Sequence, residues 1–121
     1  GATVVFIEYD RTPEKGFPHQ IEQTYEAALY VAGHAAELKV DGTRMAIAGD
    51  SAGGNMAAVV AMVARQRGGP RLLSQVLFYP VTDAAMDSGS YQEFENGPWL
   101  TRASMQWFWD AYAPVEQRTI P

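Results

Sequence analysis

Between Met45 and Arg67 the sequence passes from a short apolar run through a glycine-rich turn into a long apolar segment, and this succession constrains the fold most. MAIAG at 45–49 is typical of a strand. NMAAVVAMVARQR at 55–67 is rich in alanine and methionine and apolar nearly all round, which is typical of a buried helix. GDSAGG at 49–54 joins them, so this part of the chain predicts a strand, a tight turn and a helix.

The flanking segments extend this unit into a repeating α/β pattern. TVVFIEY at 3–9 and LLSQVLFYP at 72–80 predict two more strands, each buried on both faces. Between 18 and 38 the apolar residues recur at helical spacing, namely Ile21, Tyr25, Ala28, Ala32 and Ala35, with Leu29 and Leu38 widening the stripe. Gly68-Gly69-Pro70 should end the second helix. Three strands alternating with two helices predict βαβ crossovers and a parallel sheet.

Composition excludes several classes of function. The 121 residues suffice for one domain, and the net charge of −5 with no basic cluster argues against a nucleic-acid partner. There is no cysteine, which excludes disulfides, thiolate catalysis and zinc–thiolate sites. No apolar run approaches the roughly 20 residues of a membrane span, and no signal peptide is visible. We therefore expect a cytoplasmic protein without a membrane span, and the sequence leaves a homo-oligomer open.

The turn at 49–54 has the spacing of a nucleophile elbow, G-x-S-x-G, in the required context of a strand before and a helix after. A sharp turn lifts the hydroxyl of Ser51 clear of the sheet, and Gly49, Gly53 and Gly54 leave room for close packing. The N–H of Ala52 at the helix N-terminus would be one of two oxyanion-hole donors. The alternative is a glycine-rich turn that binds phosphate or merely reverses the chain. The dinucleotide fingerprint and the P-loop are both absent.

Four segments in this order resemble the hormone-sensitive lipase family of α/β-hydrolases, in its bacterial esterase branch. YDRTPEKGFP at 9–18 is similar to the family's Y-R-L-A-P-E-x-x-F-P, with Asp10 where arginine is usual. RMAIAGDSAGGNMAA at 44–58 matches the nucleophile region. QVLFYPVTD at 75–83 resembles the strand that ends in Y-P-x-x-D, and GPWLTRASMQWFWDAY at 97–112 resembles the segment that follows.

This resemblance implies that 1–121 is the central part of a single α/β-hydrolase domain that hydrolyses small to medium carboxylic esters through an acyl-enzyme on Ser51. Neither a cofactor nor a metal is required. The family's H-G-G-G oxyanion loop lies upstream, and its acid and histidine lie downstream of the serine. We therefore expect the isolated segment to be unstable and inactive. Two alternatives remain open: a non-catalytic ligand-binding protein on the same scaffold, and another acyl hydrolase such as a thioesterase or lactonase.

Other titratable residues have structural interpretations in the sequence. His19 and His34 precede Ser51, whereas the fold's chain order is serine, acid, histidine, so neither fits as the base. Asp83 follows the third predicted strand and is an alternative acid, although the resemblance puts the acid later. We interpret Asp50 as a loop hydrogen-bonding residue of the turn and Glu14 as a loop anchor.

The last third of the chain is irregular and carries many aromatic residues. A short helix should start after Thr101, with Met105, Phe108 and Tyr112 along one side. Two interpretations stay open for 84–113. The aromatic residues either pack a helix on the core, or they form a cap or acyl-pocket wall that excludes water from an ester. They are Tyr91, Phe94, Trp99, Trp107, Phe108 and Trp109.

Overall fold

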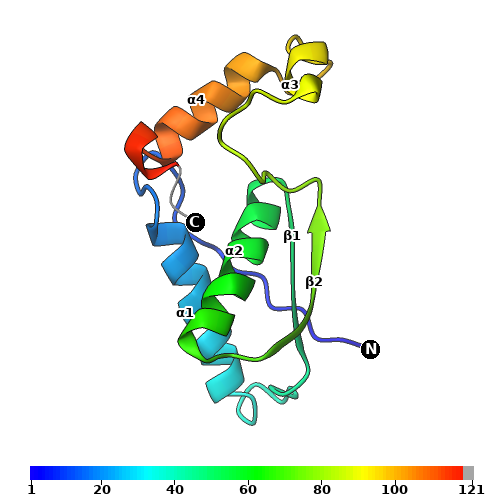
Figure 1. Ribbon diagram of the computed structural model, residues 1–121. Coiled ribbons are helices and arrows are strands. Elements are labelled where there is room, and N and C mark those ends of the chain that lie inside the picture. Colours follow the sequence, from blue (N-terminus) through cyan, green and yellow to red (C-terminus); the bar gives the residue numbers. More distant parts are fainter. Residues whose placement is uncertain (119–121) are drawn as a thin grey trace. The chain divides into compact units, whose positions relative to one another are not determined.

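The computed structural model describes residues 1–118, which divide into two compact units. The first unit comprises 1–10 and 18–81 and holds α1 (His19–Gly33), β1 (Met45–Asp50), α2 (Ala52–Arg67) and β2 (Leu72–Phe78) (Figure 1). The second comprises 11–17 and the chain from 82 onward, and holds α3 (Gly89–Glu93), α4 (Arg102–Tyr112) and the 3-10 helix η1 (Val115–Gln117).

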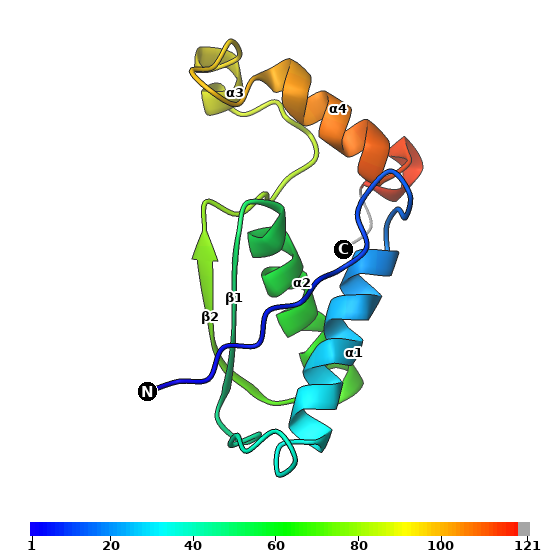
Figure 2. The ribbon, with the colours of Figure 1, turned by 180° about the vertical axis from the view of Figure 1, so that it is seen from behind.

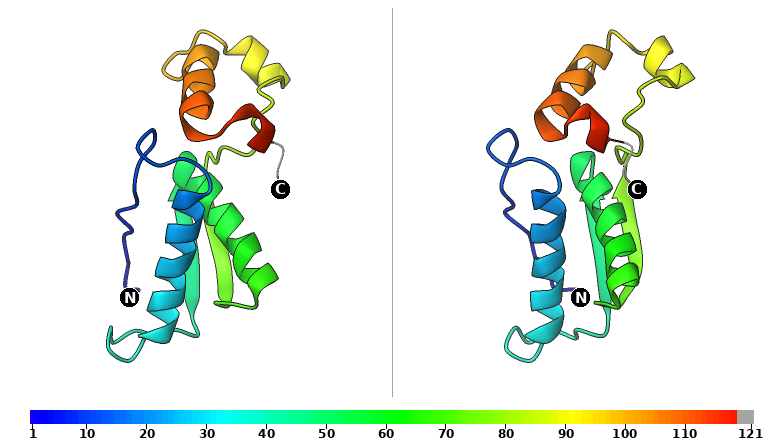
Figure 3. Two further views of the ribbon diagram at one scale, coloured as in Figure 1. Left: turned by 90° about the vertical axis from the view of Figure 1, so that its left-hand side faces the viewer. Right: turned by 60° about the vertical axis from the view of Figure 1, so that its left-hand side comes forward.

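In the first unit, β1 and β2 pair in parallel and α2 connects them, which confirms the predicted βαβ arrangement. Their register sets Met45 beside Leu72 and Asp50 beside Phe78, so both strands end at the same edge. Helix α2 packs on both strands, and α1 packs on α2, as the views from behind and from the side show (Figures 2 and 3).

The core of this unit lies between the helices and one face of the sheet. Ile21, Tyr25 and Ala28 of α1 are buried, as the stripe predicted, and Val60 of α2 is fully buried. The helical stripe stops earlier than expected, because α1 ends at Gly33 and the chain continues to residue 39 in turns. Leu29 and Leu38 are about 40% exposed, so they do not widen the buried face.

Helix α2 ends as the sequence predicts. Gly68 adopts a left-handed conformation with φ of 83°, which a residue without Cβ accepts freely, and its N–H donates to the carbonyl of Ala64. The hydroxyl of Tyr25 donates to the carbonyl of Gly69 (2.8 Å). The guanidinium of Arg67 makes a bidentate pair with Glu22 of α1 (2.6 Å) and lies over the ring of Tyr25. These contacts fasten the end of α2 to α1.

Two predictions about strands are wrong for the described residues. The segment 3–9 has no regular secondary structure, and Val4 and Phe6 are 85% and 84% exposed. A strand requires a hydrogen-bonded neighbour about 4.8 Å away, and the described sheet contains only β1 and β2. Strand β2 forms, but it is not buried on both faces. Helix α2 covers one face, and Val76 and Phe78 on the other are about half exposed. Leu73, at an irregularity in the register with β1, is also about half exposed.

In the second unit, α4 begins where the sequence predicts. The hydroxyl of Thr101 caps it by accepting a hydrogen bond from the N–H of Ser104 (3.0 Å). Met105 is buried, as expected, whereas Phe108 is about half exposed. The loop at 11–17 joins this unit through Phe17, whose N–H donates to the carbonyl of Tyr112 (2.8 Å) and whose ring meets that of Tyr112 edge to face. Burial raises the pKa of Tyr112 to about 12.

Candidate active site

Ser51 is the single residue between β1 and α2, and its backbone has a conformation that side chains other than glycine rarely adopt. Its φ is 52° and its ψ is −119°. Such a conformation is unfavourable by about 1–3 kcal/mol and persists only where the surrounding structure enforces it. The Ser51 hydroxyl makes no capping hydrogen bond to α2. A strained serine at a strand–helix corner, with a hydroxyl not used as a cap, has the geometry of a nucleophile elbow.

Two of the three glycines in this turn are required by close backbone contacts. A Cβ on Gly49 would lie 2.1 Å from the carbonyl oxygen of Gly53, and a Cβ on Gly54 would lie 2.9 Å from the Cβ of Pro80. The expectation that Gly53 also clears space is wrong for the described residues, because a Cβ there meets nothing within 4 Å. Gly53 approaches Gly49 with its carbonyl group, whereas its Cα hydrogens point into open space among the described residues.

A ring of hydrogen bonds holds Ser51 between β2 and α2. The N–H of Ser51 donates to the carbonyl of Phe78 (3.0 Å), and its carbonyl accepts from the N–H groups of Asn55 (3.1 Å) and Val81 (3.3 Å). The side-chain amide of Asn55 closes the ring by donating to the carbonyl of Val81 (2.8 Å). We call these contacts the Ser51 clasp. Sequence reasoning missed Asn55, although an amide in the otherwise apolar first part of a helix was a usable signal.

The start of α2 supplies free backbone donors beside Ser51. Ala52 is the first helical residue and is exposed. The first N–H groups of an α-helix lack acceptors within the helix and carry the positive end of its dipole. The N–H of Ala52 is therefore suited to stabilise negative charge that develops next to the Ser51 hydroxyl.

Both histidines have structural partners, in line with their interpretation from the sequence. The Nε2 of His19 lies 2.8 Å from a carboxylate oxygen of Asp10, and the N–H of Asp10 donates to the side chain of Gln23. Asp10 thus finds a partner on α1. His34 lies past the end of α1, where its Nδ1 hydrogen-bonds the carbonyl of Tyr30 and its ring stacks on that of Tyr30.

The acidic residues singled out in the sequence lie in different surroundings. Asp50 is the last residue of β1 and is exposed, so it belongs to the strand and not to a loop. Asp83 lies in the second unit, where its carboxylate accepts from the N–H of Ala85 (2.9 Å), as in a local turn. Burial, together with the nearby charge of Asp83, raises the pKa of Tyr91. Glu14 is exposed in the loop of the second unit.

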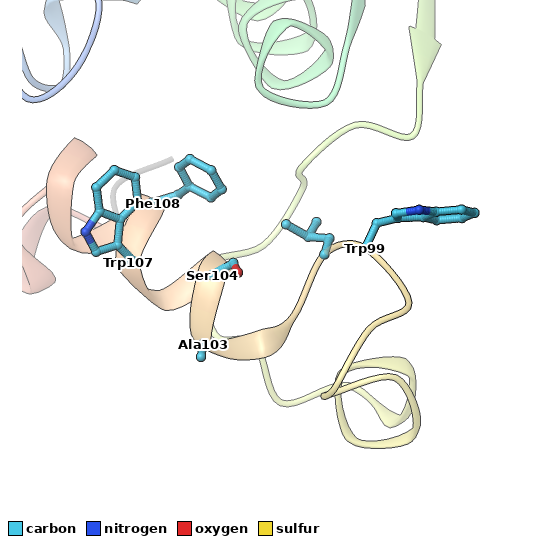
Figure 4. A pocket seen from close by; sticks show the side chains of 6 residues that line it. Trp99, Ala103, Ser104, Trp107 and Phe108 are labelled. Atoms are coloured by element: carbon cyan, nitrogen blue, oxygen red, sulfur yellow. The ribbon is translucent and has the colours of Figure 1, made fainter.

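The second unit carries an open apolar hollow of about 550 Å³ at the start of α4. The rings of Trp107 and Phe108 lie on one side of it and that of Trp99 on the other, with Ser104 between them (Figure 4). Trp99 is 93% and Trp107 is 62% exposed, so these rings do not pack a core among the described residues. Leu100 and Ala103 complete the lining.

Within residues 1–118, no group of three or more histidine, cysteine, aspartate or glutamate side chains is placed to hold a metal ion. None of the helices in the same range is both long and apolar enough to cross a membrane.

A serine at a sharp corner between a strand of a parallel sheet and a helix is typical of α/β-hydrolases. Comparison with known proteins identifies the family. Residues 1–121 match the alpha/beta hydrolase fold family over their whole length, and the chain belongs to that family. The α/β-hydrolase fold predicted from the sequence, and the resemblance to its hormone-sensitive-lipase-like esterases, are confirmed.

Individual relatives are esterases by name. The chain is 42% identical over 113 residues to the carboxylesterase NlhH of Mycobacterium tuberculosis, covering 93% of this chain and 35% of that protein. It is 36% identical over 118 residues to an ethyl acetate hydrolase of Pseudomonas putida, covering 95% of this chain and 36% of that protein. The crystal structure of a thermostable esterase from Pseudomonas putida superposes with a TM-score of 0.89 at 48% identity, over 91% of this chain and 35% of that one. The chain thus spans about a third of the length of the relatives it matches.

Proposed function

We propose that the whole protein is a serine carboxylic-ester hydrolase and that Ser51 is its nucleophile. The observation that carries this proposal is the backbone of Ser51, which is strained at φ of 52° and held by the Ser51 clasp at the corner between β1 and α2. The hydroxyl of this strained serine does not cap α2, so capping does not explain the strain. A nucleophile elbow requires a strained backbone of this kind.

The reaction follows from this geometry. The Oγ of Ser51 attacks the ester carbonyl carbon, a general base takes the hydroxyl proton, and the carbonyl oxygen becomes an oxyanion that the N–H of Ala52 helps to stabilise. Collapse of this intermediate expels the alcohol, which takes the proton back from the base, and leaves an acyl-enzyme. Water then attacks the acyl-enzyme by the same route and releases the acid. We place the base outside residues 1–121, since both histidines are engaged elsewhere. The acid that orients it lies outside these residues too, as the resemblance to the esterase family implies, and Asp83 is the alternative.

The substrates we propose are esters with small to medium acyl groups. The names of two relatives, a carboxylesterase and an ethyl acetate hydrolase, support this class. The cytoplasm remains our predicted compartment for the protein.

We further propose that 84–113 contributes an apolar wall to the substrate pocket. The exposed rings of Trp99, Trp107 and Phe108 around the hollow support this role, because packing within the unit does not account for them. Trp107→Ala should therefore lower kcat/KM for longer acyl chains more than for acetate, while leaving the melting temperature of the full-length protein nearly unchanged. Equal losses for all chain lengths would contradict this role.

The proposed function is tested by hydrolysis of p-nitrophenyl esters with full-length Ser51→Ala. We expect kcat to fall by several orders of magnitude, as on removal of a nucleophile elsewhere. His34→Ala is the matched control and should keep kcat within a few-fold, because the His34 ring contacts Tyr30, through a hydrogen bond to its carbonyl and by stacking on its ring, and not Ser51. Retained turnover in Ser51→Ala would refute the assignment. Ester binding without turnover in the wild-type protein would favour the ligand-binding alternative, and faster turnover of thioesters or lactones would favour the other acyl hydrolases.

A further inference from the structure

Tyr79 lies beside Ser51 because the hydrogen bonds on both sides of it end on that serine. The carbonyl of Phe78, one residue before Tyr79, accepts from the N–H of Ser51, and the N–H of Val81, two residues after it, donates to the carbonyl of Ser51. The Asn55 side chain fixes the same stretch through the carbonyl of Val81. The loop at 79–81 is therefore held around the serine.

The backbone of Tyr79 is strained, with φ of 38°. A bulky residue with positive φ is a rare outlier, and glycine would adopt this conformation without strain. Three other residues besides glycines share positive φ among those described: Lys39, Ser51 and Met86. Lys39 lies in a turn after α1, Ser51 is the elbow, and Met86 is buried (6% exposed).

Neither burial of the side chain nor a turn after a helix explains the positive φ of Tyr79. Its side chain is 76% exposed, so the strain is not offset by packing of the ring. An aromatic ring at a strained and exposed position, on a loop whose backbone is hydrogen-bonded to Ser51, is available to a ligand. Aromatic rings offer about 150–250 Å² of apolar contact area, which suits the organic part of an ester.

We propose that Tyr79 is a specificity-determining residue that contacts the substrate and limits the size of the ester group bound next to Ser51. This inference rests on the proposed esterase function. The ring closes one side of the site, so esters with bulky branched or aromatic groups on that side are excluded while small ones are accepted. The Ser51 clasp keeps the ring in this position because it leaves the loop at 79–81 little freedom.

The test compares full-length wild type with Tyr79→Ala on two series of esters: acyl groups from acetyl to pivaloyl with p-nitrophenol, and acetates of alcohols from ethanol to 1-phenylethanol. One extra or missing methylene group in an apolar site changes kcat/KM by roughly 10–200-fold. We expect the kcat/KM ratio of bulky to small esters to rise at least about tenfold in one series. Tyr79→Phe is the matched control, which keeps the ring and should leave the ratio within about threefold.

Tyr79→Gly covers the case in which the alanine variant fails to fold, since glycine relieves the positive φ while also removing the ring. It should raise the ratio as Tyr79→Ala does. Labelling of Ser51 by a fluorophosphonate separates the two proposals. If Ser51 is labelled at the wild-type rate in a folded variant and the ratio is unchanged in both series, the role of Tyr79 is refuted. If the folded wild type is neither labelled nor active on any ester, the proposed function itself is refuted, and the role of Tyr79 with it.

Discussion

Gly49→Ala perturbs the elbow directly, and the structure sets the size of the effect. The new Cβ would lie 2.1 Å from the carbonyl oxygen of Gly53 and 2.3 Å from its carbonyl carbon, whereas Cβ atoms in real structures stay beyond 3.0 Å. The strand or the first turn of α2 must therefore move by about 1 Å. Overpacking typically destabilises by about 1–3 kcal/mol, and here the obstacle is backbone, so we expect about 3 kcal/mol or more. A displacement of 1 Å near the chemistry lowers the rate by about a hundredfold.

The assay is thermal unfolding and p-nitrophenyl acetate hydrolysis of the full-length protein. The relatives are about three times as long as these 121 residues, and for a chain of that length 3 kcal/mol corresponds to a fall of about 4 °C in melting temperature. Gly53→Ala is the matched control, because a Cβ at that position has open space among the described residues. It should keep kcat within a few-fold and stabilise α2 by about 0.5–1 kcal/mol, as alanine does in a helix. If Gly53→Ala proved as damaging as Gly49→Ala, the assignment of the steric requirement to Gly49 would be wrong.

Three further predictions concern the clasp, an ion pair and the isolated segment. Asn55→Asp should slow the labelling of Ser51 by a fluorophosphonate at pH 7, because a carboxylate cannot donate a hydrogen bond to the carbonyl of Val81. At acid pH the new side chain is protonated and can donate, so the labelling rate relative to wild type should recover. The same recovery in Asn55→Ala would contradict this explanation. The hydrogen bond from Arg67 lowers the pKa of Glu22, so its stabilisation is present at neutral pH and lost in acid. Glu22→Gln should therefore slightly lower the melting temperature at pH 7 and leave it unchanged near pH 3, and an equal loss at both would refute the pairing. The 121-residue segment alone should show no cooperative calorimetric transition, and a sharp one would contradict the expected instability.

The sequence was sufficient to predict the elements whose signals are local. The tight turn between β1 and α2 follows from small residues between a short apolar run and an apolar helix, and α1 follows from Ile21, Tyr25 and Ala28 at helical spacing. The end of α2 at Gly68 and the start of α4 after Thr101 follow from capping chemistry, which involves only neighbouring residues.

Features that depend on residues far apart in the chain could not be predicted from local patterns. The composition of 3–9 favours a strand, but a strand forms only beside a partner, and no residue within the segment supplies one. The hydrogen bond from Asn55 to Val81 joins residues 26 positions apart. The positive φ of Tyr79 has no signal of its own, since tyrosine disfavours that conformation and only the contacts of its neighbours with Ser51 impose it.

The central claim, that Ser51 is an activated nucleophile, is tested most directly by treating the folded full-length protein with a fluorophosphonate and locating the adduct by peptide mass. We predict one adduct, on Ser51, and none in Ser51→Ala. A folded protein that stays unmodified, or one that is modified at another residue while Ser51 remains free, would contradict the account.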